Sequence, residues 1–144
     1  PGHSSSDITY LEKRDNGGLL MAKKKWGVVP YRIIEGKVEV LIITTRNENW
    51  GLPKGNLIKK IGGKGTASQE AYEEAGIVGY IDGKGESFKQ GDSLIFHFYP
   101  MMVWEEFNNW PEKDCRNRMW VSPTDARKML NCKAHRKAVA KLAA

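Results

Sequence analysis

Hydrophobic and β-branched residues fall into short runs along the chain, separated by glycine-containing turns, and this pattern predicts a set of strands. The expected strands are residues 27–34, 38–44, 77–81, 87–89, 94–104 and 119–121. Glu35-Gly36-Lys37 is expected to close a hairpin between the first two strands. Pro100 lacks a backbone donor, so we expect it to bulge the long fifth strand or to place that strand at a sheet edge.

The first helix is expected over residues 67–75, after a glycine-rich loop at 62–65. Thr66 and Gln69 have the spacing of a capping box, in which each side chain bonds the backbone N–H of the other residue. Gly76 is expected to end the helix, because glycine adopts the left-handed conformation that helix ends favour.

Two further helices are expected near the end of the chain. Ser122-Pro123-Thr124-Asp125 has a capping serine, a proline at the first helical position and an acid in the first turn, so a helix should run from there to about residue 130. Residues 133–142 are expected to form the last helix. Strands with one central helix and two terminal helices indicate an α+β layered domain with a mixed sheet.

Three glutamates crowd one face of the first helix. Glu70, Glu73 and Glu74 stand three or four positions apart, so they are neighbours on the helix surface. Like charges this close destabilise a helix unless a cation neutralises them. The expected cation is Mg²⁺, with Mn²⁺ as the alternative, because hard cations take oxygen ligands. The alternative interpretation is a solvated acidic helix face.

The flanking residues favour the metal interpretation. Trp50-Gly51-Leu52-Pro53-Lys54-Gly55 precedes the glutamates, and Gly76-Ile77 follows them, in a spacing that resembles the Nudix box. Two positions depart from that box: Ile61 replaces a glutamate and Gln69 replaces an arginine. In the family these two residues support the metal-binding carboxylates, so their joint loss in this chain removes both members of a supporting pair.

The resemblance implies a Nudix-type α/β/α sandwich that hydrolyses a diphosphate linkage by attack of water on phosphorus. It implies that Glu70, Glu73 and Glu74 are catalytic residues and metal ligands, with the carbonyl of Gly55 as an additional ligand. The general base stays open between these glutamates and three later acids. The later acids are Glu105, Glu106 and Glu112.

Within the family, three segments resemble the diphosphoinositol polyphosphate and diadenosine polyphosphate hydrolases. They are Thr44-Thr45-Arg46, Trp110-Pro111-Glu112 and Arg116-Asn117-Arg118-Met119-Trp120. The implied substrate is a polyphosphorylated small molecule, bound by Arg46, Trp50, Lys54, Arg116 and Arg118. The alternatives are RNA 5′-end pyrophosphate removal and a catalytically silent nucleotide-binding domain.

Length and charge bound the remaining expectations. The chain of 144 residues suits one domain over 21–144, with residues 1–20 as a flexible leader that is in part a cloning scar. The net charge of +6 favours polyanionic partners, although Lys23-Lys24-Lys25 is expected to be a solvated basic edge. Two cysteines without metal-ligand spacing suggest a reduced, cytoplasmic setting, and no apolar run is long enough to predict a membrane partner.

Overall fold

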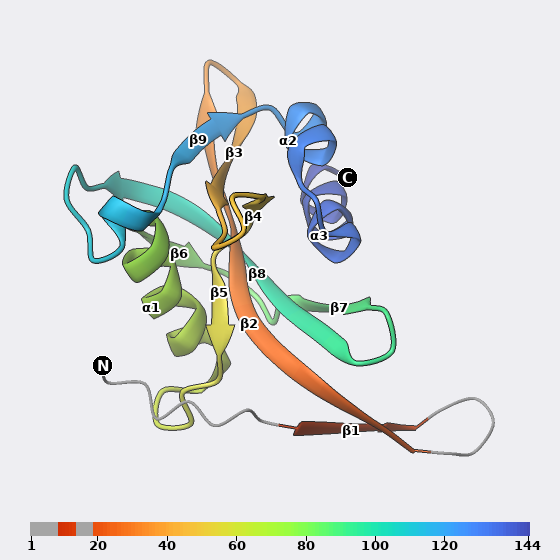
Figure 1. The fold of residues 1–144 in the computed structure, drawn as a ribbon. Helices are drawn as coiled ribbons and strands as arrows, with labels where there is room; N and C mark the ends of the chain where they lie inside the picture. The colour runs from red at the N-terminus through yellow and green to blue at the C-terminus, as the bar shows by residue number, and fades with distance from the viewer. Residues whose placement is uncertain (1–8, 14–18) are drawn as a thin grey trace.

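The computed structural model describes residues 9–13 and 19–144. These residues form one mixed sheet of nine strands with helices on both faces (Figure 1). The strands are β1 (Thr9–Lys13), β2 (Leu19–Ile34), β3 (Lys37–Thr44), β4 (Trp50–Gly51), β5 (Lys54–Asn56), β6 (Ile77–Ile81), β7 (Glu86–Gln90), β8 (Leu94–Glu106) and β9 (Arg118–Val121). The helices are α1 (Gly62–Ala75), α2 (Pro123–Met129), α3 (Lys133–Ala143) and the 3₁₀ helix η1 (Lys113–Cys115).

The centre of the sheet runs in the order β4-β3-β2-β8-β6. Strands β2 and β8 pair in parallel, and the other strand pairs are antiparallel. The predicted hairpin between β2 and β3 is confirmed: Ile34 pairs with Lys37, and Gly36 takes a positive φ of 79° in the turn. The parallel pair requires a long crossover, and that crossover carries β5 and α1.

Two apolar layers hold the helices to the sheet. On one face, Ala67, Ala71 and Ala75 of α1 pack against a cluster that includes Val28 and Leu41. The opposite face is covered by α2 and α3 through a second cluster (Figure 1). The predicted three-layer α+β sandwich with a mixed sheet is therefore confirmed.

The start of α1 differs from the prediction. The helix begins at Gly62, and Thr66 lies inside it, fully buried, with its Oγ1 accepting a hydrogen bond from Ile58 N at 2.9 Å. The capping box predicted at Thr66 is therefore wrong. Gly63 serves close packing instead, since a Cβ on this residue would lie 2.6 Å from the Trp26 ring. Gly76 ends the helix as predicted, with φ at 67°.

Strand β8 runs through Pro100 without a break. It lies inside the sheet and pairs Pro100 with Val29 of β2. On its other side, β7 pairs up to Phe98 and β6 begins at Met101. Pro100 thus falls in the gap between two partner strands, where a missing N–H breaks no ladder, and the expected bulge or edge at this residue is wrong.

The described part of the N-terminal region is paired. Strand β1 pairs with the first five residues of β2, from Leu19 to Lys23, and the sequence pattern did not indicate this strand. The predicted leader otherwise covers residues 1–8 and 14–18, which lie outside the described ranges. At the other end of the chain, the Ser122 side chain caps α2 as predicted by accepting from Asp125 N at 3.1 Å. Within the described residues, no helix is long and apolar enough to cross a membrane.

Candidate active site

The three glutamates of α1 differ in their exposure. Glu70 and Glu74 are buried, each at 5% of its full exposure, whereas Glu73 is half-buried. The side chain of Glu73 accepts a hydrogen bond from Gln69 Nε2 at 2.7 Å. Gln69 therefore orients a glutamate from the position where the Nudix box has arginine. Ile61, the other departure, is 45% exposed and packs against Gly65 at the start of the helix.

Strand β5 lies directly against the two buried glutamates. Lys54 N donates to Glu74 Oε1 at 3.3 Å. A Cβ added to Gly55 would lie 2.6 Å from Glu70 Oε1, so only glycine leaves room for this carboxyl group. The short strand after the Trp50–Gly55 segment thus fixes the position of both carboxyls through its backbone.

Burial controls the protonation of this pair. It raises the pKa of Glu70, and it raises the pKa of Glu74 to about 8, against the opposing charge of Lys54. The two carboxyls also hydrogen-bond to each other. Two adjacent carboxyls removed from water favour sharing a proton over carrying two charges, and a bound divalent cation would take over the proton's role.

Cationic side chains surround the glutamates in one cleft of about 700 Å³. The acidic residues lining it are Glu70, Glu73, Glu74 and Glu112. The basic residues lining it are Lys25, Arg46, Lys54 and Arg116. Lys25 was expected to be a solvated basic edge, but its pairing with Asn56 of β5 places it at the cleft. Only the pairing of β2 with β5 could have indicated this.

Arg116 joins three elements at the wall of the cleft. Its Nη1 donates to Thr44 O at 2.8 Å, and its Nε and Nη2 contact Glu112 Oε1 at 2.9 and 2.8 Å. Its Nη2 also lies 3.7 Å from Glu74 Oε2. Because the side chain is only 10% exposed, its charge acts on Glu74 with little screening by solvent.

Arg118 lies away from the cleft and holds the end of α1. Its Nη1 donates to Ala75 O at 2.7 Å, its Nη2 donates to Phe107 O at 2.6 Å, and its Nε lies 3.2 Å from Glu106 Oε2. The guanidinium also stacks 3.9 Å from the centre of the Trp110 ring. These contacts occupy the donors of Arg118, so its position corrects the expectation that it binds substrate.

A second cavity of about 850 Å³ adjoins the cleft. Both cavities are lined by Thr45, Arg46, Glu112 and Arg116. Trp50 lines the second cavity, where its side chain is partly buried against the core beneath α2 and α3. Arg46 and Trp50 therefore stand where the cleft continues away from the glutamates.

The later acids predicted as general bases fall in different places. Glu105 is exposed on β8, and Glu106 contacts Arg118 and the Trp120 Nε1. Neither lines the cleft. Glu112 does line it, and its charge helps to raise the pKa of Glu70, so it lies within electrostatic reach of the buried pair.

The carboxylate oxygens of four glutamates line one cleft, and such oxygens are suitable ligands for a divalent cation. Within the described residues, however, no three carboxylate, imidazole or thiolate side chains already surround one point. The contact between the Glu70 and Glu74 carboxyls is the start of such a set.

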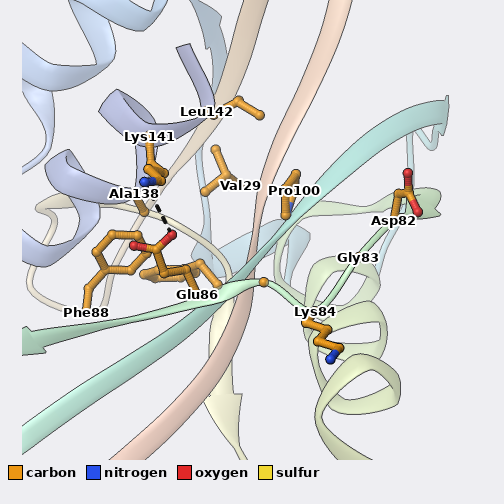
Figure 2. Close-up of a pocket in the computed structure, with 12 residues that line it drawn as sticks. Val29, Asp82, Gly83, Lys84, Glu86, Phe88, Pro100, Ala138, Lys141 and Leu142 are labelled. Carbon is orange, nitrogen blue, oxygen red and sulfur yellow. Dashed lines mark ion pairs between the residues drawn. The ribbon is translucent and has the colours of Figure 1, made fainter. Parts of the chain in front are cut away.

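A separate cavity of about 220 Å³ lies on the opposite face of the sheet, beneath α3 (Figure 2). Its wall is mostly apolar, with Val29, Pro100 and Leu142, and the ion pair of Lys141 with Glu86 at 3.8 Å lies at its side. It contains no cluster of carboxylates, so the glutamate cleft is the stronger candidate for catalysis.

Comparisons with known proteins find sequence relatives and solved structures that share the fold. No family model matches the chain. Nudix hydrolase 21, chloroplastic, from Arabidopsis thaliana is 34% identical over 110 residues, which are 69% of this chain and 56% of the relative. Nudix hydrolase 17, mitochondrial, from the same plant is 32% identical over 114 residues, or 70% of this chain and 63% of the relative. The chain thus spans about three fifths of the length of these relatives.

Solved structures share the fold. The structure of a C. elegans Ap4A hydrolase in a binary complex superposes with a TM-score of 0.64 and 21% identity, covering 83% of this chain and 94% of the other. At this identity the likeness concerns the three-layer sandwich.

Proposed function

The chain belongs to the Nudix hydrolase family, and on that premise we propose that it hydrolyses a phosphoanhydride bond of a polyphosphorylated small molecule with the help of a divalent cation. The observation that carries the proposal is the cleft in which four glutamates face four basic side chains. A bound cation and a polyanionic substrate need both signs of charge within one site. A merely solvated acidic helix face would not bury Glu70 and Glu74.

Glu70, Glu73 and Glu74 would hold the cation, Mg²⁺ or Mn²⁺, with the Gly55 carbonyl as a further ligand. When bound, the cation neutralises charge on the phosphoryl oxygens and lowers the pKa of water. The protein contributes position: Gly55 leaves room for Glu70, and the Lys54 amide holds Glu74.

Basic side chains would bind the phosphates that are not attacked. Lys25 and Lys54 stand in the cleft beside the glutamates, and Arg46 and Arg116 stand where it opens into the second cavity. Guanidinium groups suit this role because their planar donors match phosphate oxygens. Trp50 would then border the part of the substrate that lies beyond the phosphates.

Glu112 is our choice of general base. Among the three later acids it alone lines the cleft, and Arg116 holds one of its oxygens at 2.8 Å. A base fixed in this way can take the proton from a water molecule as that water attacks phosphorus.

The substrate class that we propose is a dinucleoside polyphosphate or a diphosphoinositol polyphosphate. The Ap4A hydrolase fold and the two adjoining cavities support a long, polyanionic substrate. A cytoplasmic location stays a prediction, since the two relatives carry chloroplastic and mitochondrial in their names.

A substrate screen with two variants tests the proposal. Purified protein with Mg²⁺ is assayed on diadenosine polyphosphates, a diphosphoinositol polyphosphate, a nucleotide sugar and triphosphorylated RNA. We expect turnover on the first two, and a loss of about a hundredfold or more in Glu73→Gln and Glu74→Gln. Preference for RNA would favour the 5′-end alternative. Turnover unchanged in both variants, or absent from the parent on every substrate, would reject the proposal.

A further inference from the structure

A buried imidazole joins α3 to the segment before the glutamates. His135 is only 2% exposed, and its Nδ1 accepts a hydrogen bond from Leu52 N at 3.2 Å. Because Nδ1 is the acceptor, we assign the neutral tautomer with its proton on Nε2. Among the described residues, Nε2 has no hydrogen-bond partner.

The surroundings of His135 keep it neutral. The rings of Phe96 and Phe98 lie 4.6 and 5.1 Å from the imidazole, at nearly right angles to it. Burial among these rings, together with the charge of Lys54, lowers the pKa of His135 to about 3. The acceptor at Nδ1 is therefore available throughout the neutral pH range.

The amide that His135 binds begins the segment on which the carboxyls rest. Leu52 is fully buried and lies between β4 and β5. The next residue, Pro53, accepts from Val28 N at 3.1 Å, and Lys54 N then donates to Glu74. Gly55 follows, against Glu70. Each residue from 52 to 55 is thus anchored, first to α3, then to β2, and finally to the two glutamates.

We propose that His135 is a positioning residue for the glutamate site, which holds the Leu52 amide and through it the Leu52–Gly55 segment under Glu70 and Glu74. An apolar residue would fill the same space between Phe96 and Phe98 but would leave a buried N–H without an acceptor. The effect on turnover rests on the proposed function. The effect on the segment itself does not.

Three variants separate this role from general packing. His135→Leu removes the acceptor, whereas His135→Asn keeps an acceptor near the position of Nδ1. Val139→Ala is the matched control, because Val139 is fully buried on the same helix and loses only apolar contact when shortened. The measurements are amide hydrogen exchange at Leu52 and Lys54 by NMR, and kcat and KM with Mg²⁺ on the substrate found in the screen.

We expect the Leu52 amide of the parent to exchange as slowly as the amides of β3. In His135→Leu, exchange at Leu52 and Lys54 should rise at least tenfold and kcat should fall about tenfold, with KM within twofold of the parent. His135→Asn should restore both values to within about threefold, and Val139→Ala should leave kcat unchanged at temperatures where it is folded.

Fast exchange of Leu52 in the parent, or unchanged exchange in His135→Leu, would overturn the proposal. An equal loss of kcat in Val139→Ala would also overturn it, because the effect would then be one of packing. If the parent hydrolyses no substrate, the proposed function fails, and the exchange data still decide whether His135 holds the segment.

Discussion

Replacing Glu74 with glutamine tests the account of the buried carboxyl pair without changing its shape. The amide mimics a protonated carboxyl: its oxygen can accept from Lys54 N, and its NH₂ group can donate to Glu70. The variant should therefore fold as the parent does. What it removes is the titration of a carboxyl that is 5% exposed.

The size of the effect follows from the pKa of Glu74, which burial raises from 4.5 to about 8. A carboxyl with a raised pKa keeps its proton in the native state and releases it on unfolding, so its contribution to stability is lost as pH rises from 4.5 toward 8. At about 1.4 kcal/mol per pKa unit, the loss between about pH 5.5 and pH 8 is about 3 kcal/mol of unfolding free energy.

Urea unfolding with a chelator present, at these two pH values, measures the loss. The parent should be less stable at the higher pH, and Glu74→Gln should lack most of this dependence, so that its advantage over the parent grows by about 3 kcal/mol between the two pH values. Glu73→Gln is the control on the same helix face and should keep the parent's slope. A parent whose stability is flat or rises over this range would refute the reasoning, as would Glu74→Gln with an unchanged slope.

Three further outcomes are expected. Gly55→Ala should displace the Glu70 carboxyl and lower turnover at least about tenfold while the melting temperature changes little; parent-like kinetics would contradict the packing argument. Arg118→Ala should lower the free energy of unfolding by about 2 to 4 kcal/mol without raising KM, because its contacts hold the end of α1. Arg116→Ala should raise KM. A raised KM in Arg118→Ala with an unchanged KM in Arg116→Ala would indicate that Arg118 binds substrate. Because the pKa of His135 is lowered from 6.5 to about 3, its contribution to the free energy of unfolding is present above pH 6.5 and is lost as pH falls toward about 3. The loss reaches about 2 kcal/mol at about pH 5, and acid unfolding of His135→Leu should not show it.

Local patterns predicted the elements whose ends are set by local chemistry. The hairpin at Gly36 needs a positive φ, the end of α1 needs Gly76, and the start of α2 needs the Ser122 cap, and each is found as expected. The information for these features lies within four or five residues, so the sequence alone sufficed.

Features set by distant contacts were not predictable in this way. Gly63 lies in the first turn of α1, where its missing side chain admits the ring of Trp26 of β2, and only the folded sheet brings Trp26 near. Pro100 is tolerated inside the sheet because two partner strands, β6 and β7, leave a gap beside it. The local propensities of glycine and proline had predicted a loop at Gly63 and a bulge or a sheet edge at Pro100.

The candidate site shows the same division. The resemblance to the Nudix box grouped Gly55 with Glu70 and Glu74 as ligands of one metal ion. The structure brings Gly55 against Glu70 and the neighbouring Lys54 amide against Glu74, and the binding of a metal there stays a prediction. Lys25 and His135 were not indicated, since the first depends on the pairing of β2 with β5 and the second on the docking of α3.

Phosphorus NMR of hydrolysis in ¹⁸O-enriched water tests the central claim, that water attacks phosphorus at the glutamate cleft with a divalent cation bound. The parent should cleave diadenosine tetraphosphate in the presence of Mg²⁺ and place ¹⁸O on a phosphoryl group of one product. A chelator should stop the reaction, and Glu73→Gln should slow it about a hundredfold or more. Products without ¹⁸O, cleavage that continues in the chelator, or a Glu73→Gln rate equal to that of the parent would contradict the account.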